Sequence, residues 1–359
     1  MRLSYSFGVK EQRGAALDNP LFELLAAVAE AGSIRHAAQQ LGASYRYVWG
    51  ALRKWERTLG SPLMTWSQGQ RARLTEFAER LLWTERSVRV RMQPHLEALR
   101  SDLAGIVVEA HDATQQLLRI AASHDLALPI LQQHLAQEAQ LHLDISFRGS
   151  AAALRALNQQ HCVLAGFHVP VAQTPANAYA RTLQPLLHPR EHALIPCARR
   201  LQGLMVRKEH AMAVRSLADV AALQLRFVNR QPGSGTRLLI EHLLQSAGIA
   251  PVALQGFDRH VEQSHIAVAL CVASGVADAG IGVQAAALQY GLQFVPILQE
   301  HYFLACHVAV ATRPAVSRLC AVVAGPRWGQ ILANLPGYEP ASAAGAILPV
   351  AEVLPWWPR

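Results

Sequence analysis

The chain has few charged and aromatic residues for its length, and few cysteines. Of its 359 residues, 16% are charged and 6% are aromatic, whereas 51% are hydrophobic. A chain this apolar can bury large cores, which excludes an extended disordered protein. At about 150 residues per domain, the length predicts two or three domains.

The cysteine pattern excludes a disulfide framework. The chain has 5 cysteines, an odd number, and no pair has the spacing of a metal site. Reduced, buried thiols in the cytosol fit this pattern best. We therefore expect no metal site and no cofactor. The cysteines are Cys162, Cys197, Cys271, Cys306 and Cys320.

Long hydrophobic runs are also lacking. The apolar stretches are broken by glycine or charge before they reach the length that crosses a bilayer. The segment from Met1 to Pro20 has no apolar core of a secretory signal. These two absences predict a cytoplasmic protein with no membrane partner.

Positive charge is concentrated near the N-terminus. The net charge is +8, which suits a polyanionic partner. Between Ile34 and Arg73 one acid, Glu56, stands against a group of basic residues. These are Arg35, Arg46, Arg53, Lys54, Arg57, Arg71 and Arg73.

The same segment has the pattern of a helix-turn-helix. Ser33 is placed to cap a helix from Ile34 to Leu41, and Ser44 to cap one from Tyr45 to Leu59. Gly42 stands in the short turn between them, as the helix-turn-helix requires. Before them, an apolar face that includes Leu21 and Val28 predicts a first helix that starts at Pro20, with Asn19 as its N-cap.

In such a unit the start of the second helix reaches base edges, here Ser44, Tyr45, Arg46 and Tyr47. Arg53 and Lys54 are better placed for phosphates. The residues expected to pack inward are Val48, Trp49, Leu52 and either Trp55 or Leu59.

A basic hairpin follows the third helix. Pro62 to Trp66 and Arg71 to Leu74 read as its two strands, around a turn at Gln68 to Gln70. Arg71 and Arg73 would then contact the DNA backbone or minor groove. The simpler alternative is a small helical subdomain whose arginines are merely solvated.

These motifs resemble the N-terminal domain of LysR-type regulators. The Tyr45-Arg46-Tyr47-Val48-Trp49 segment is closer to the molybdate-responsive ModE-type variant, although the hairpin is shorter than the ModE-type wing. The residues that carry the resemblance are Ala31-Gly32-Ser33-Ile34, Ala37-Ala38, Leu41-Gly42, Ser44, Leu59-Gly60, Pro62-Leu63 and Leu74-Thr75.

A long helix with an apolar seam follows. Its apolar positions recur at roughly heptad spacing and are Leu81, Val88, Met92, Leu96, Leu99 and Leu103. The seam resembles the linker helix that pairs two LysR-type subunits, which implies a dimer or a tetramer. Pro94 predicts a kink or break. The alternative is a helix packed on its own domain.

Strands and helices then alternate, which predicts an α/β domain with a parallel open sheet. Predicted strands cover Leu118 to Ser123, Leu141 to Phe147 and Cys162 to Phe167. Ligands in such sheets bind at the carboxyl ends of strands. Ser123, Ser150 and His168 fall at these ends and are candidate ligand residues.

A glycine-rich loop from Arg230 to Arg237 opens a later helix. Free N–H groups and the helix dipole make such a loop an anion site. Its candidate ligand residues are Ser234, Gly235, Thr236 and Arg237. His265, at the start of another helix, is a further candidate.

The whole stretch resembles the two-lobed, type II periplasmic-binding-protein-like sensor of ModE-related and LysR-type regulators. The resemblance is carried by Arg200-Leu201-Gln202-Gly203-Leu204, Asn229 to Arg237, Ser264-His265-Ile266-Ala267-Val268-Ala269, Ala277-Asp278-Ala279-Gly280-Ile281-Gly282 and Glu300-His301-Tyr302. It implies crossings between lobes near Ile195 to Leu204 and Phe294 to Glu300. It also implies a small-anion effector such as molybdate or tungstate. A formate-like carboxylate suits a pocket of hydroxyls, helix N-termini and an arginine as well.

Each candidate has a structural alternative. Ser123 and Ser150 are equally suited to cap helices. Arg237 could pair with Glu262 or Asp278, and His265 could be a buried hydrogen-bond partner.

The sequence therefore predicts a winged helix-turn-helix over residues 19–75, a linker over 76–104, a two-lobed sensor over 115–337 and a tail over 338–359. The predicted function is a ligand-responsive DNA-binding regulator. An enzyme on the same fold is the alternative, with Ser234 or Ser123 as nucleophile and His265 as base. A nucleophile elbow is lacking, and the sequence indicates no carboxylate to orient the base. A carrier protein would leave the basic segment without a purpose.

Overall fold

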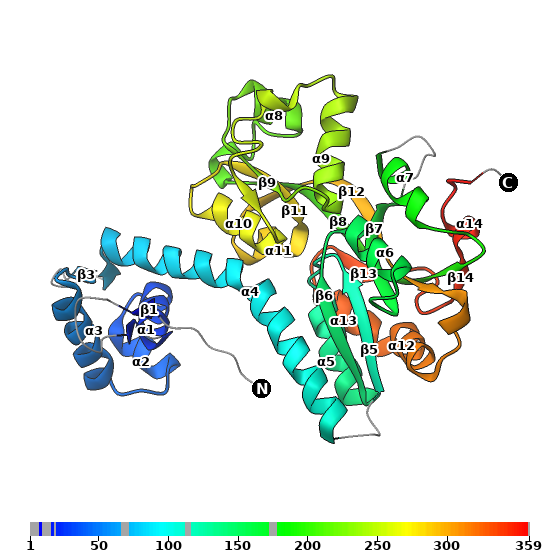
Figure 1. The fold of residues 1–359 in the computed structure, drawn as a ribbon. Coiled ribbons are helices and arrows are strands. Elements are labelled where there is room, and N and C mark those ends of the chain that lie inside the picture. The colour runs from blue at the N-terminus through cyan, green and yellow to red at the C-terminus, as the bar shows by residue number, and fades with distance from the viewer. Residues whose placement is uncertain are drawn as a thin grey trace. The chain divides into compact units, whose positions relative to one another are not determined.

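The computed structural model describes residues 7–8, 16–17, 19–65, 72–111, 116–171 and 178–357. The chain divides into two compact units, Met1–Met92 and Gln93–Arg359 (Figure 1). Each unit is described by itself below.

The N-terminal unit is built on three helices, α1 (Asn19–Ala31), α2 (Ile34–Gln40) and α3 (Tyr45–Leu59). The Ser33 side chain accepts a hydrogen bond from the His36 amide, and the Ser44 side chain accepts one from the Tyr47 amide. Gly42 has φ of 61°, a left-handed conformation that most side chains avoid, at the turn between α2 and α3. The helix-turn-helix predicted from the sequence is confirmed.

A short antiparallel pair follows α3, formed by β3 (Met64–Thr65) and β4 (Arg73–Leu74). These strands lie in the predicted hairpin. The turn at Gln68 to Gln70 and Arg71 lie outside the described residues. A second pair that the sequence did not predict joins β1 (Phe7–Gly8) to β2 (Ala16–Leu17).

The core of this unit holds the apolar faces of α1, α2 and α3 together with the hairpin. Leu21 and Leu25 from α1, Val48 from α3 and Leu63 beside β3 are fully buried. This core fixes α3 in place, so the rest of its surface is free to contact another molecule.

The long helix α4 (Glu76–His111) begins where the Thr75 hydroxyl accepts a hydrogen bond from the Ala78 amide. The helix continues through Pro94 without a break, and the kink expected there stays a prediction. The boundary between the two units falls at Met92 and Gln93, beside this proline.

The larger unit contains one 10-stranded mixed sheet. Eight strands follow the order β10-β9-β11-β8-β12-β7-β5-β6, and β13 and β14 pair with β8 outside this order. The prediction of a parallel sheet holds for β5, β6 and β7, whereas β8 and β12 run antiparallel to their neighbours. The strands are β5 (Gln116–Ala122), β6 (Leu141–Phe147), β7 (Leu164–Pro170), β8 (His192–Val206), β9 (Phe227–Arg230), β10 (Val261–Glu262), β11 (Ala279–Val283), β12 (Gln293–His307), β13 (Tyr338–Pro340) and β14 (Leu348–Pro349).

Two strands, β8 and β12, are 15 residues long and join the two lobes of this unit. One end of β8 pairs with β11, which leads to β9 and β10, while β12 pairs with β7 near its other end. The predicted crossings at Ile195 to Leu204 and Phe294 to Glu300 lie within these strands.

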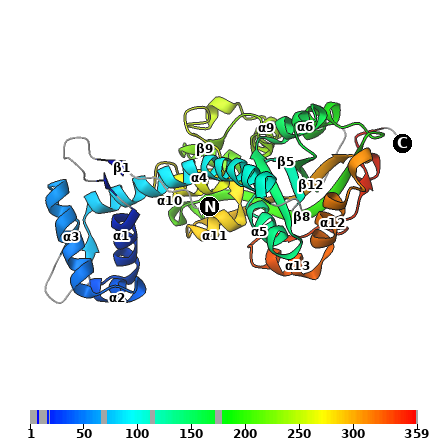
Figure 2. The same cartoon turned by 60° about the horizontal axis from the view of Figure 1, so that its bottom comes forward.

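Helices cover both faces of the sheet, with α6 and α9 on one side and α5, α12 and α13 on the other (Figure 2). The helices are α5 (Leu128–Glu138), α6 (Ser150–Asn158), α7 (Ala178–Leu183), α8 (Leu217–Ala222), α9 (Gly235–Ser246), α10 (His265–Ala273), α11 (Gln284–Gln289), α12 (Pro314–Ala324), α13 (Pro326–Ala333) and α14 (Val350–Val353), with short 3-10 turns η1 (Gln184–Leu186), η2 (Lys208–His210), η3 (Pro251–Ala253) and η4 (Val308–Val310).

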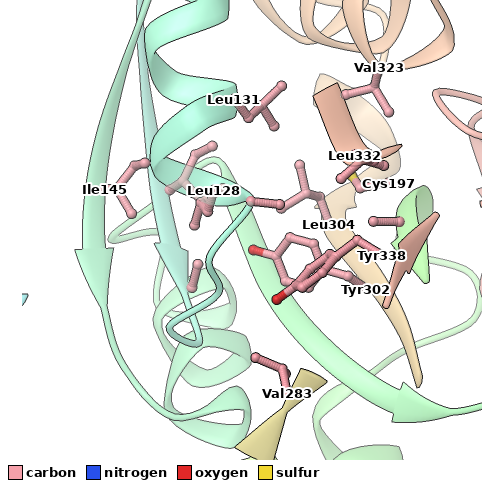
Figure 3. Close-up of a cluster of buried hydrophobic side chains, with 14 of the residues drawn as sticks. Leu128, Leu131, Ile145, Cys197, Val283, Tyr302, Leu304, Val323, Leu332 and Tyr338 are labelled. Carbon is pink, nitrogen blue, oxygen red and sulfur yellow. The ribbon is translucent and has the colours of Figure 1, made fainter. Parts of the chain in front are cut away.

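Two apolar cores hold these layers together. One includes Leu128 and Leu131 of α5 with Tyr302 and Tyr338 (Figure 3). The other includes Tyr179 of α7 and the side chains of α6 and α9. Figure 3 shows the two tyrosine hydroxyl oxygens pointing the same way from the first core.

The boundary predicted at residue 338 is wrong. Strands β13 and β14 both pair with β8, and Trp356 is buried in the second core. The Gln184 amide donates a hydrogen bond to the Trp356 carbonyl at 2.7 Å. The predicted tail is therefore part of the sheet domain.

Candidate functional site

The N-termini of α6 and α9 meet inside the larger unit. Ser150 is the first residue of α6 and Gly235 the first of α9. A Cβ atom added to Gly235 would lie 3.6 Å from Ser150 Oγ. The Ser150 hydroxyl is fully buried and has no hydrogen-bond partner within the described residues. Free N–H donors at two helix starts and this hydroxyl therefore converge.

Beside them lies a buried ion network centred on Arg200 of β8. Its guanidinium donates to Asp125 Oδ2 at 2.7 Å and contacts Glu300 Oε2 at 2.9 Å. All three side chains are almost completely buried. The two carboxylates raise the pKa of Arg200 above its ordinary value, which overcomes the opposing effect of burial.

The network extends to α9 through Gln202, whose Nε2 donates to Glu300 Oε2 at 2.6 Å and to Thr236 Oγ1 at 3.2 Å. The Tyr179 hydroxyl donates to the Gly235 carbonyl at 2.8 Å. The start of α9 is thus fixed against strands β8 and β12.

A second chain of hydrogen bonds runs from Ser123 to His168 to Asp125. Ser123 Oγ lies 2.8 Å from His168 Nδ1, and His168 Nε2 lies 3.1 Å from Asp125 Oδ2. Burial and the nearby Arg200 lower the pKa of His168, so the ring is neutral at pH 7. Ser123 then donates to the ring, and the ring donates to the carboxylate.

Arg230 is a second cation of the site. Among the described residues it has no carboxylate partner within salt-bridge distance. It lies at the end of β9 and is 3% exposed. Its Nη2 donates to the Gln263 carbonyl at 2.9 Å, and its Nη1 has no partner in the described structure. Burial, and next the charge of Arg200, lower the pKa of Arg230 to about 9. A buried guanidinium without a carboxylate partner is stabilised when an anion binds beside it.

Two further histidines near Arg230 are neutral. Burial, and then the charge of Arg230, lower the pKa of His124 to about 4 and hold that of His265 well below its ordinary value. Both Nδ1 atoms are buried without a partner among the described residues. His265, a predicted ligand residue, therefore lies beside the site as an uncharged ring.

Arg237 does not face this cluster, which corrects its predicted role. Its guanidinium binds Glu241 at 2.7 Å and Asp258 at 3.0 Å, and it stacks 4.0 Å from the ring of Phe257. These partners are also not those weighed from the sequence. Arg230, seven residues earlier, supplies the buried cation instead.

The other predicted ligand residues divide into two groups. Ser150, Gly235, Thr236, Ser123 and His168 join the cluster through the contacts above. Ser234 caps α9, because its hydroxyl oxygen accepts from the Arg237 amide at 3.2 Å, and its O–H group donates to the Gln231 carbonyl at 2.9 Å.

Sequence reasoning missed four charged residues of the site and one amide. Asp125, Arg200, Arg230, Gln202 and Glu300 were not among the candidates. Arg230 flanks the glycine-rich loop and could have been considered with Arg237. Arg200 and Glu300 are 100 positions apart, and the segments that contain them, although they carry the family resemblance, do not indicate that the two would pair.

In the N-terminal unit, α3 presents Tyr45 and Tyr47 to solvent, at 51% and 61% exposure. Arg46, Arg53 and Lys54 are exposed as well, while Ser44 caps the helix. The hydroxyl oxygen of Ser44 accepts from the Tyr47 amide at 3.1 Å. All six positions are exposed, so α3 and its cap carry basic and aromatic side chains that can contact another molecule.

Trp49 was predicted to pack inward but is 41% exposed. Val48 and Leu52 occupy the buried face of α3 instead. The Arg53 guanidinium lies 5.4 Å from the Trp49 ring. Trp49 also lines a groove of about 580 Å³ with Arg53, Glu56, Arg57, Gly60, Ser61 and Pro62.

The hairpin adds one exposed arginine, Arg73 in β4. On α4, the seam residue Leu99 is 54% exposed and Met92 is 40% exposed. Within the described part of the chain, no helix is long and apolar enough to cross a membrane. The same residues hold no cluster of side chains that would bind a metal ion.

Comparison with known proteins assigns both units. Residues 132–324, more than half of the chain, match the PBP superfamily domain. The chain belongs to the PBP superfamily. Residues 21–79 match the bacterial regulatory helix-turn-helix protein, lysR family. The pairing of these two domains is that of a LysR-family, ligand-responsive transcriptional regulator.

Two uncharacterised relatives are similar to this PBP superfamily chain. YvgK of Bacillus subtilis is 30% identical over 181 residues, which are 50% of this chain and 58% of YvgK. The chain thus spans less than two thirds of that relative. A protein from the 5' region of the ferredoxin 2Fe-2S gene of Clostridium pasteurianum is 30% identical over 103 residues, 28% of this chain and 90% of that protein.

Solved structures of similar organisation include a hydrogen-peroxide-bound mutant of Corynebacterium glutamicum OxyR, at 17% identity and a TM-score of 0.44, covering 89% of this chain and 94% of that one. ArgP from Mycobacterium tuberculosis is similar at 14% identity and a TM-score of 0.39, covering 86% and 96%.

Proposed function

We propose that this regulator senses a small anion at the polar cluster where the N-termini of α6 and α9 meet. The observation that carries the proposal is Arg230, a buried guanidinium without a carboxylate partner in the described structure, with one N–H group left unpaired. The oxyanions and small carboxylates predicted from the sequence, molybdate, tungstate and formate among them, belong to this class.

The surrounding groups support an anion over a cation. The starts of α6 and α9, which carry partial positive charge, lie close together, because a Cβ atom on Gly235 would lie 3.6 Å from Ser150 Oγ. The carboxylates of Asp125 and Glu300 are already bound by Arg200. The nearby histidines are neutral, and the Arg230 Nη1 group has no acceptor among the described residues, so it can donate to a ligand.

The N-terminal unit supplies the second half of the proposal, which is binding to double-stranded DNA in the cytoplasm. Tyr45, Arg46 and Tyr47 stand exposed at the start of α3, where a helix-turn-helix reaches base edges. Arg53 and Lys54 would contact phosphates, and Arg73 would contact the backbone from the hairpin. The exposed seam of α4 would join two copies of the chain.

An enzyme remains a second candidate because Ser123, His168 and Asp125 are linked in the order of a hydrolytic triad. The carboxylate that was missing from the sequence reading is Asp125. Its oxygen Oδ2 also binds Arg200 at 2.7 Å and Tyr338 at 3.0 Å. Because the Asp125 carboxylate is paired with Arg200, this carboxylate stabilises a charged His168 less than an unpaired carboxylate would. We therefore propose that the hydrogen bonds that link Ser123, His168 and Asp125 order the binding site.

Calorimetric titration of the full chain with molybdate, tungstate, sulfate, phosphate and formate tests the sensor half. We expect at least one of these anions to bind, and to change the affinity for a promoter fragment in a fluorescence anisotropy assay. An unrelated duplex of equal length is the control for sequence preference. Failure of every anion to bind would contradict the sensor proposal, and equal affinity for both duplexes would contradict specific DNA binding.

A further inference from the structure

The Gln202 side chain leaves a hydrogen-bond acceptor unused inside the site. Gln202 is completely buried. Its amide nitrogen is bonded to Glu300 and Thr236. Its carbonyl oxygen Oε1 has no hydrogen-bond partner among the described residues. A buried carbonyl oxygen without a partner is unusual, because its lost hydration is not replaced.

The orientation of this amide is fixed by its neighbour. A carboxylate accepts hydrogen bonds and cannot donate them. Glu300 Oε2 accepts from the Arg200 guanidinium at 2.9 Å, as a carboxylate oxygen does in an ion pair. The group that faces it at 2.6 Å must then be the NH₂ of Gln202. A flipped amide would set two acceptors against each other, so Oε1 remains an acceptor.

The donors of the site belong to the same network. Thr236, which Gln202 contacts, lies in the first turn of α9, and Gly235 before it faces Ser150 Oγ. Arg230 adds its unpaired N–H group. The polar groups left for a ligand are therefore mixed. Arg230 Nη1 can only donate, which suits a negative charge, the Ser150 hydroxyl can donate or accept, and Gln202 Oε1 can only accept.

We propose that the effector is an anion that also carries a hydrogen-bond donor, and that Gln202 Oε1 accepts from it. The donor is the hydroxyl of a protonated oxyanion or of a small hydroxycarboxylate. This inference rests on the anion-sensing function proposed above and narrows it to one chemical class.

The donor on the ligand decides specificity, because a buried site binds weakly any ligand that leaves a polar group of the site without a hydrogen-bond partner. An anion without a donor would place an oxygen lone pair against Oε1. We expect such anions to bind at least about tenfold more weakly than donor-bearing anions of the same shape.

Matched pairs of small anions test this preference by calorimetry on the full chain at pH 7. Phosphate, which keeps at least one proton at this pH, is paired with sulfate, which keeps none. Glycolate, which carries a hydroxyl, is paired with acetate. We expect phosphate to exceed sulfate and glycolate to exceed acetate by at least about tenfold wherever one member of the pair binds.

The variant Gln202→Met removes the acceptor while keeping the length of the side chain. In this variant the preference should fall to less than about threefold, because the lone pair of the ligand no longer meets an acceptor. Gln299→Met is the matched control. Gln299 lies on β12 and donates to Glu339, outside the site, so this variant should keep the parental preference.

The outcomes separate the two proposals. Equal affinities within each pair for the parental chain would overturn the donor requirement and leave anion sensing standing. If Gln202→Met keeps the parental preference for donor-bearing anions, another group causes that preference, and the proposed role of Gln202 is overturned. Binding of none of the four probes, nor of molybdate or formate, would overturn the sensing function itself. The parental ratios decide the question even if Gln202→Met fails to fold.

Discussion

A Cβ atom placed on Gly149 would lie 2.4 Å from the carbonyl oxygen of Gly233. Gly149 precedes α6 and Gly233 precedes α9, so this contact joins the two loops that open the proposed site. The φ and ψ of Gly149 are −66° and 156°, which any residue can adopt. Glycine is therefore required here by the neighbouring backbone and not by its own conformation.

The variant Gly149→Ala should push these loops apart. The clash is with backbone, which cannot rotate away, and overpacking of this kind costs about 1–3 kcal/mol. We expect the affinity for the tightest-binding anion among molybdate, phosphate, sulfate and formate to fall about tenfold. Calorimetry measures this, with thermal unfolding as a check on the fold. Gly50→Ala, with no atom within 4 Å of the new methyl group, is the control. Parental affinity in Gly149→Ala would show that the contact does not shape the site.

Exchanging one arginine for glutamine should distinguish the two cations of the glycine-rich loop. Arg230→Gln removes the unpaired charge and should weaken anion binding at least about tenfold, since a charge-assisted hydrogen bond contributes roughly 1.5–3 kcal/mol. Arg237→Gln breaks ion pairs with Glu241 and Asp258, so it should change stability and leave anion affinity within about threefold. The reverse order of the two affinities would restore Arg237 as the ligand residue.

Stability of the larger unit should fall on acidification, in part through His124. Burial, and then Arg230, lower its pKa in the folded chain from 6.5 to about 4. Between these values the unfolded chain takes up a proton that the folded chain does not, so the free energy of unfolding decreases as pH decreases. In His124→Gln this slope should be shallower by up to about 1.4 kcal/mol per pH unit. Urea unfolding at several pH values across the window measures it, and a slope identical to that of the parent would rule out the buried neutral ring.

Charge in the seam of α4 should prevent association of two chains. Leu99 is more than half exposed in the single chain, and Leu99→Glu would bury a carboxylate if this face forms the dimer. We expect a shift to the monomer mass in light scattering. Arg86→Glu places the same charge on another side of the helix, because residues advance about 100° each. This control should stay dimeric. A dimeric Leu99→Glu would show that the chains associate through another surface.

Local signals explain what could be predicted from the sequence. Ser33 and Ser44 cap their helices because a hydroxyl three residues before a free amide is a short-range relation, visible in the sequence itself. The glycine-rich loop before α9 was recognised for the same reason. Trp49 was misplaced because the helical period alone does not tell which edge of the apolar face a core covers, and Val48 and Leu52 fill it.

Charges brought together by topology could not be predicted. Arg200 of β8 meets Glu300 across 100 positions, because the two residues are partners where β8 pairs with β12. It meets Asp125, which lies in the loop after β5, across 75 positions. Their local sequences show no motif that would link them. The choice between Arg230 and Arg237 likewise depends on Asp258 and Glu241, which draw the second arginine away.

The two short strands β13 and β14 have a consequence for synthesis of the chain. The edge of β8 that β12 leaves free is covered at one end by β11 and at the other by residues 338–349. Until the ribosome has added these residues, that edge offers unpaired N–H and C=O groups to any other strand. The helix-turn-helix, with its own core, lies some 260 residues earlier in the sequence and can fold first. A nascent chain would therefore gain its DNA-binding surface before its sensor can respond. A chain stalled during synthesis would carry the DNA-binding surface without a sensor that can respond.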